Sequence, residues 1–113
     1  MAKVKIIKSL LEQIQKKFKG ESHKIIDLLE SLEENPHKGK LLGSVGGLLI
    51  KELKYKGFRF YFIVEGEKLK VFSASLLVEI LLLFVRMSDK NSQQKIINEI
   101  KNILKKIGPE GLL

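Results

Sequence analysis

Basic residues recur along a stretch of the chain that is patterned to form β-strands. Apolar residues alternate with other types from residue 58 onward, which is typical of a strand with one buried face. That face would carry Phe58, Phe60, Phe62 and Val64. Arg59 and Tyr61 would lie on the opposite face, which we expect to be solvent-exposed. Further cations occur in the same stretch at Lys51, Lys54 and Lys56.

These residue types suit one kind of chemistry, the cleavage of RNA by attack of its own 2′-hydroxyl group. Arg59 and Lys54 could stabilise the charge that develops on phosphorus, and such stabilisation often contributes most to the rate of this kind of reaction. Tyr61 or a lysine could move protons if its pKa were lowered. In the alternative interpretation Arg59 pairs with the nearby acid Glu52 across the hairpin, and Tyr61 packs on a helix.

The overall charge is compatible with an anionic partner. The chain has 113 residues and a formal net charge of +8. Such a surface suits the phosphates of RNA, DNA or an anionic membrane. A solvated lysine-rich surface, common in proteins from hot environments, is the other interpretation.

Several classes of site are not indicated. The chain has no cysteine, which fits a reducing cytosol, and its two histidines, His23 and His37, are 14 residues apart. We therefore predict no metal site and no cofactor. The N-terminus is a poor match to a signal peptide, and the longest apolar run, Leu76 to Val85, is shorter than a membrane span. We expect a cytoplasmic protein with no membrane partner.

The first third of the sequence predicts a short strand and two helices. Val4 to Ile7 reads as the strand. Ser9 is a candidate helix cap, with a glutamate three residues later, and Gly20 would end that helix. Ser22 would begin a second helix that ends before Asn35-Pro36. Two amphipathic helices joined by a short turn predict a helical hairpin.

The remainder predicts a loop, strands and a final helix. Residues 37–47 are rich in glycine and read as a loop. Strands are expected over Leu48–Tyr55, Phe58–Glu65 and Lys68–Ser73, with turns at Gly57 and Gly66-Glu67. Leu76 to Met87 favours a buried helix capped by Ser75, with a strand over Val78–Arg86 as the alternative. A stripe of isoleucines and Leu104 predicts a last helix that ends at Gly108-Pro109.

These elements predict one α+β domain over residues 1–113. A helical hairpin packs on a small antiparallel sheet, helices cover one face of it, and a C-terminal helix follows. Phe58, Phe60, Phe62 and Val64 should be buried against Leu29, Leu32 and the hairpin.

The order of several short motifs resembles the RelE/ParE toxin superfamily. A leucine-rich helix is followed by an Asn-Pro turn, a Gly-Lys-Leu-x-Gly loop, a Glu-Leu-Lys strand and a Gly-x-Arg-x-Tyr segment. The matching residues are Asn35, Pro36, Gly39, Lys40, Leu41, Gly43, Glu52, Leu53, Lys54, Gly57, Arg59 and Tyr61. Residues 81–100 are similar to the last strand and helix of the HigB-like branch. The resemblance covers roughly residues 28–100 and implies a RelE-like fold.

The resemblance also implies a function. It implies a metal-independent endoribonuclease that acts on mRNA, usually at the ribosome, and is held inactive by a small antitoxin, although some ParE-like members act on gyrase instead. The catalytic residues would be Lys54, Arg59, Tyr61, Arg86 and Lys90, with Lys51 and Lys56 binding RNA. Met87 stands where a second lysine is expected, and no histidine or tyrosine lies near the C-terminus. These departures leave open a second interpretation, a non-catalytic protein of the same fold that binds gyrase, nucleic acid or an antitoxin, or an inactive remnant.

Overall fold

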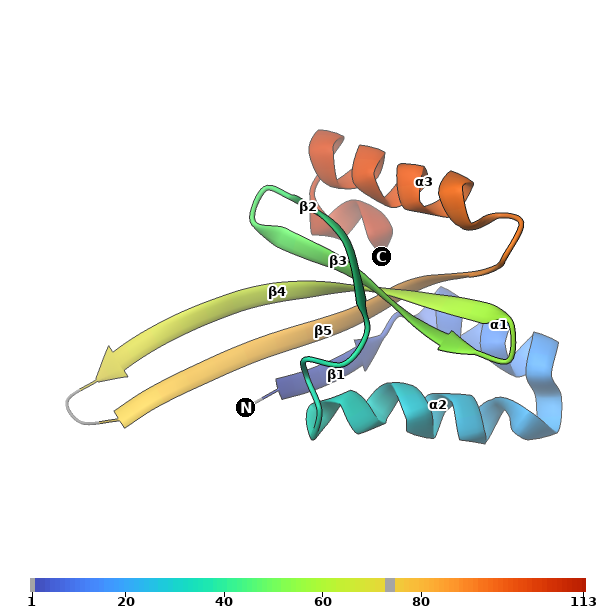
Figure 1. Ribbon diagram of the computed structural model, residues 1–113, viewed down its shortest axis with the longest axis horizontal. Helices are drawn as coiled ribbons and strands as arrows, with labels where there is room; N and C mark the ends of the chain where they lie inside the picture. Colours follow the sequence, from blue (N-terminus) through green and yellow to red (C-terminus); the bar gives the residue numbers. More distant parts are fainter. Residues whose placement is uncertain (1, 73–74) are drawn as a thin grey trace.

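The protein folds around a five-stranded mixed sheet with helices on both faces (Figure 1). The computed structural model describes the backbone of residues 2–72 and 75–113, and the side chains of these residues except 66–79. The strands are β1 (Ala2–Ile6), β2 (Lys40–Val45), β3 (Leu48–Tyr55), β4 (Phe58–Phe72) and β5 (Ser75–Asp89). The helices are α1 (Lys8–Phe18), α2 (Ser22–Glu30) and α3 (Gln93–Lys106). Short 3-10 turns are η1 (Lys19–Glu21), η2 (Ser31–Glu33) and η3 (Pro109–Leu112).

The strand order is β1-β5-β4-β3-β2. Strands β2 to β5 form an antiparallel meander, in which the pairing of β3 with β4 was expected. β1 runs parallel to β5, so the sheet is mixed rather than antiparallel. A parallel pair needs a long connection. Here the chain passes through the α1–α2 hairpin and then through β2, β3 and β4 before it returns as β5 beside β1. The α+β class and the helical hairpin are confirmed.

Strand β5 replaces the buried helix that we favoured for residues 76–87, so the alternative interpretation is confirmed. β5 lies between β4 and β1 in the sheet and is covered on both faces where β1 pairs with it. Four consecutive residues there are buried, Leu82, Leu83, Phe84 and Val85. A strand buried on both faces is apolar throughout, which removes the alternation that would identify it.

Two further predictions about the strands are wrong. The glycine-rich loop contains β2, which pairs with β3 from Lys40↔Glu52 to Val45↔Leu48. Gly46 and Gly47 have φ of 57° and 83°, as a two-residue hairpin turn requires. The predicted turn at Gly66-Glu67 is instead an irregularity inside a continuous β4, where the register against β5 shifts between Glu65 and Lys68. Ser73, the expected end of that strand, lies outside the described residues.

Helix α1 starts two residues earlier than predicted. It begins at Lys8 after Ile7, and no side chain caps its first turn, so the capping role expected for Ser9 is wrong. Gly20 lies in η1, which leads directly into α2. The Ser22 hydroxyl donates a hydrogen bond to the Lys19 carbonyl at 2.7 Å and so stabilises this turn between the two helices.

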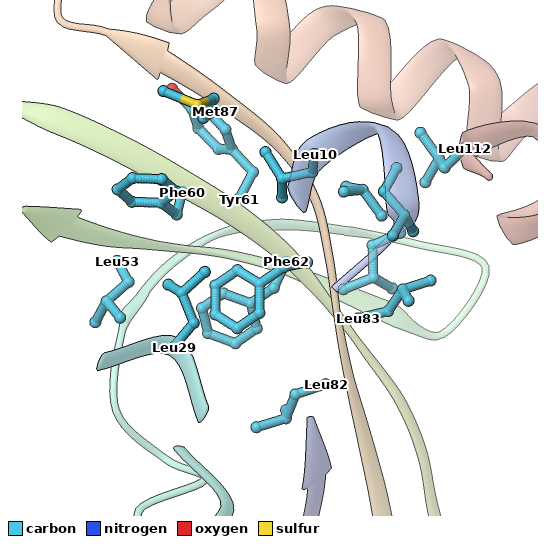
Figure 2. Packing of buried hydrophobic residues seen from close by; sticks show 14 of the residues in the cluster. Leu10, Leu29, Leu53, Phe60, Tyr61, Phe62, Leu82, Leu83, Met87 and Leu112 are labelled. Atoms are coloured by element: carbon cyan, nitrogen blue, oxygen red, sulfur yellow. The ribbon is translucent and has the colours of Figure 1, made fainter. Parts of the chain in front are cut away.

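The α1–α2 hairpin packs on a face of aromatic rings (Figure 2). Phe18 of α1 meets Phe58 edge-on at 5.1 Å between ring centroids, and Phe62 lies 4.7 Å from Phe84. Phe60 and Phe62 are fully buried, as are Leu29 and Leu32, whereas Phe58 and Val64 are partly buried. The predicted register of β4 is therefore confirmed.

The opposite face is not open to solvent. Helix α3 lies across it (Figure 1) and presents the buried residues Ile97, Ile100 and Leu104. Tyr61 and Ile63 point to this side, because neighbours along a strand face opposite ways. The expectation of a one-sided sheet is wrong, because α3 forms a second core layer that covers the strand positions we expected to face water.

Candidate functional site

The candidate residues lie in two neighbouring rows across the sheet. Lys54, Arg59 and Ser88 are cross-strand partners on β3, β4 and β5. Partners in a sheet share a face and have Cβ atoms about 5 Å apart. The second row consists of Lys40, Glu52, Tyr61 and Arg86. Both rows lie on the face that α3 covers, so the sheet brings together the catalytic residues expected on its strands.

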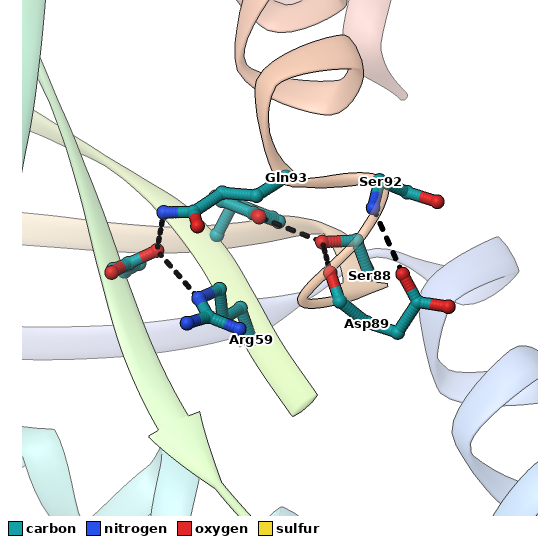
Figure 3. A network of polar contacts seen from close by, with 7 residues as sticks. Arg59, Ser88, Asp89, Ser92 and Gln93 are labelled. Atoms are coloured by element: carbon teal, nitrogen blue, oxygen red, sulfur yellow. Dashed lines mark hydrogen bonds and ion pairs between the residues drawn. The ribbon is translucent and has the colours of Figure 1, made fainter. Parts of the chain in front are cut away.

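Arg59 is buried and paired with an acid. The residue is 9% exposed, and its Nε lies 3.7 Å from Oε2 of Glu52, which is 1% exposed. Gln93, the first residue of α3, donates from Nε2 to the same Glu52 oxygen at 3.2 Å (Figure 3). The prediction of a solvent-facing Arg59 is wrong, because α3 begins directly above it. The alternative, an ion pair across the hairpin, is what the structure shows.

Tyr61 is a buried hydrogen-bond donor. It is 0% exposed, and its hydroxyl lies 2.7 Å from Ser88 Oγ. Ser88 Oγ donates its own proton to the Asp89 carbonyl at 2.9 Å, so the tyrosine donates to the serine. Burial raises the pKa of the Tyr61 phenol above its ordinary value. A neutral, covered phenol does not fit the expected role in proton transfer.

Arg86 connects the sheet to the C-terminal elements. Its Nε donates to Glu99 Oε2 of α3 at 2.9 Å. Its Nη1 donates to the carbonyls of Val85 at 2.7 Å and Leu112 at 3.1 Å. These contacts hold α3 and η3 against β5, and they engage the guanidinium that was expected to bind phosphate.

Lys54 and Lys90 are exposed at this end of the sheet. Lys54 is the cross-strand partner of Arg59. Lys90 directly follows β5, whose last residue, Asp89, pairs with Phe58. The Asp89 carboxylate accepts a hydrogen bond from the Ser92 backbone at 2.9 Å, which lowers the pKa of Asp89 and orders the connection from β5 to α3. An RNA backbone could reach Lys54 and Lys90 directly, with Arg59 beneath the start of α3.

The two lysines predicted to bind RNA lie outside the two rows of candidate residues. Lys51 is the partner of Phe62 on the face of the helical hairpin, and its ammonium donates to the His37 carbonyl at 3.1 Å. Partial burial lowers the pKa of Lys51. Lys56 sits in the β3–β4 turn, where its Nζ lies 3.6 Å from Glu21 Oε1. The prediction that Lys51 shares a surface with Lys54 and Arg59 is wrong, because residues three apart on a strand face opposite ways.

Within the described residues, no three histidine, cysteine or acidic side chains lie together as a candidate metal site. None of the helices there has the length and apolar character needed to cross a bilayer. His23 and His37 are both exposed.

Three contributors to this site were missed from the sequence, namely Ser88, Gln93 and Glu99. Ser88 would have been found if residues 75–89 had been assigned as a strand, because it follows Arg86 by two residues and shares its face. Gln93 and Glu99 left no comparable signal, because polar residues on a predicted helix are normally assigned to solvent.

Comparisons of the chain with models of known protein families, with curated protein sequences and with solved structures each found no match.

Proposed function

We propose that the protein is an RNA-directed toxin of the RelE/ParE type. It is the toxin component of a toxin–antitoxin system, a metal-independent endoribonuclease that cleaves mRNA at the ribosome in the cytoplasm. A small antitoxin protein would hold it inactive. The observation that carries this proposal is the row formed by Lys54 and Arg59, with the exposed Lys90 at the same end of the sheet. The order of motifs described above supports the same assignment.

In the proposed reaction Lys54 and Lys90 bind the RNA backbone, because both are exposed at this end of the sheet. Arg59 stabilises the negative charge that builds up on the phosphoryl oxygens, for which its planar fork of donors is suited. Tyr61 and Arg86 act as positioning residues. Tyr61 fixes β5 through Ser88, and Arg86 fixes α3 through Glu99.

A second candidate function is favoured by the same contacts. Tyr61 is covered, so it is not placed to transfer a proton to or from RNA, and Arg86 is engaged by Glu99, so its guanidinium is not free to bind a phosphate. A protein of this fold that binds gyrase or nucleic acid without cleaving it would have no need of such a group.

Controlled expression in a bacterial host separates the two candidates. The endoribonuclease should cause rapid loss of a reporter mRNA with defined 5′ ends, and purified protein should cut mRNA on ribosomes in the presence of EDTA. Lys54→Ala should slow cleavage, whereas Lys106→Ala, at the exposed end of α3, should not. Growth arrest with DNA damage and intact mRNA would support action on gyrase instead. Intact mRNA on ribosomes would contradict the proposed activity.

A further inference from the structure

The pair formed by Glu52 and Arg59 is unusual because it is buried but incompletely bonded. Neither Glu52 Oε1 nor Arg59 Nε has a hydrogen-bond partner among the described residues. The contact of 3.7 Å between Arg59 Nε and Glu52 Oε2 is an ion pair but is too long for a hydrogen bond. Buried polar groups are nearly always hydrogen-bonded, so each exception calls for an explanation.

Stability does not explain this pair. Removing two charges from water is costly, and their attraction repays that cost only if the remaining donors and acceptors are satisfied. Here the guanidinium has one loose contact to an acid. A phosphate with two free oxygens would give Arg59 a closer, bidentate partner. A bound phosphate could therefore give the Arg59 guanidinium better hydrogen bonds than Glu52 gives it.

The start of α3 keeps the arginine in that position. Gln93 donates to the same oxygen, Glu52 Oε2, that faces Arg59. Glu52 is thus held between the helix and the arginine, and the first turn of α3 covers both. The neighbouring cation Lys54 is already exposed.

We propose that Glu52 and Gln93 form a latch that withholds Arg59 from the phosphate site in the resting protein. RNA first contacts Lys54, and Arg59 then exchanges Glu52 for a phosphate. The ligand named here rests on the proposed function, whereas the latch itself does not. Glu52 is a positioning residue in this scheme, because it acts through Arg59.

Two substitutions separate the parts of the latch. Glu52→Gln removes the negative charge but keeps an oxygen that can accept from Gln93. Gln93→Ala keeps the charge and removes the contact to α3. Gln94→Ala is the matched control, since Gln94 is exposed and donates to Asn98 within α3.

The rate of chemical modification of Arg59 reports whether the latch is closed, and this measurement needs no RNA. Arg59 and Arg86 are the only arginines of the chain, so mass spectrometry after treatment with phenylglyoxal reports each one separately. Arg59 should react slowly in the native protein. Its rate should rise by about tenfold or more in Glu52→Gln, because a buried charge without its partner moves to water. Its rate should also rise in Gln93→Ala, because Glu52 then loses the hydrogen bond that holds it between α3 and Arg59. The rate of Arg86 should stay constant and serves as a check that the protein remains folded.

RNA binding tests whether the ligand that Arg59 exchanges for Glu52 is an RNA phosphate. Glu52→Gln should bind single-stranded RNA about tenfold more tightly, because a carboxylate near the phosphate is removed. A faster reaction at Arg59 without tighter RNA binding would uphold the latch and contradict the proposed function. If Arg59 reacts no faster in Glu52→Gln and Gln93→Ala than in Gln94→Ala, the latch is overturned.

Discussion

Replacing Arg59 by alanine should destabilise the fold, although the sequence alone placed this residue in solvent. Arg59 is 9% exposed, and Glu52 beneath α3 is 1% exposed. At 3.7 Å and an effective dielectric constant of about 20, the attraction between the two charges is about 4 kcal/mol. Arg59→Ala removes this attraction and leaves a buried carboxylate alone. We therefore expect the free energy of unfolding to fall by about 3–5 kcal/mol, a large part of the roughly 5–15 kcal/mol of a typical domain.

A double substitution separates this structural cost from function. Replacing a buried ion pair by apolar residues of similar volume is often neutral for stability. The free energy of unfolding of the double variant Glu52→Leu with Arg59→Met should therefore lie within about 1.5 kcal/mol of the value for the native protein. Compared with Glu52→Gln, which also lacks the carboxylate, the double variant should bind RNA at least about tenfold more weakly, because it lacks the arginine.

The assays are urea unfolding followed by circular dichroism and titration of labelled RNA. If Arg59→Ala unfolds at the same urea concentration as the native protein, leaving the Glu52 carboxylate without Arg59 has no cost, and the expected loss of stability is wrong. If the double variant is stable and binds RNA as tightly as Glu52→Gln, Arg59 does not contact RNA.

Three further predictions concern the contacts around the site. Tyr61→Phe should lower the free energy of unfolding in urea by about 1 kcal/mol, because the hydrogen bond to Ser88 is lost, and should leave RNA binding unchanged. Loss of RNA cleavage at full stability would instead make Tyr61 catalytic. Arg86→Ala should lower the free energy of unfolding by about 1–3 kcal/mol and increase the rate of amide hydrogen exchange in α3, since the charged hydrogen bond to Glu99 is lost. An unchanged exchange rate would show that Arg86 does not hold the helix. The lowered pKa of Asp89 means that its contribution to stability is complete above the ordinary value of 3.8 and is lost as the pH falls through the folded value. A carboxyl titration followed by NMR should therefore place its midpoint below 3.8, and a midpoint at or above 3.8 would contradict the hydrogen bond to the Asp89 carboxylate.

Much of the fold could be predicted from local patterns. The apolar stripes of α1, α2 and α3 have helical spacing, and β3 has the predicted bounds Leu48–Tyr55. Alternation also set the register of β4 correctly, which placed Arg59 and Tyr61 together. These features depend on neighbours along the chain, and such neighbours are what periodicity reports.

The remaining features depend on contacts between distant segments. The sequence of β5 shows no alternation of apolar and polar residues, because β5 lies between β1 and β4 and helices cover both of its faces. The burial of Arg59 follows from the position of α3, whose first residue, Gln93, lies 34 positions later in the chain. Alternation along β4 distinguishes its two faces, but it does not reveal what covers the second one. The sequence therefore placed Arg59 and Tyr61 correctly on one face of the sheet, and their exposure was predicted wrongly.

The most direct test of the central claim is the salt dependence of RNA binding in the native protein and in Lys54→Ala. Binding through phosphates releases counterions, so the logarithm of affinity should fall steeply with the logarithm of salt concentration. Lys54→Ala should reduce that slope by about 0.7, the value for one phosphate contact on a single strand. Lys106→Ala should leave the slope unchanged. A native affinity that is flat between low and physiological salt, or a slope that Lys106→Ala reduces and Lys54→Ala does not, would contradict RNA binding at this end of the sheet.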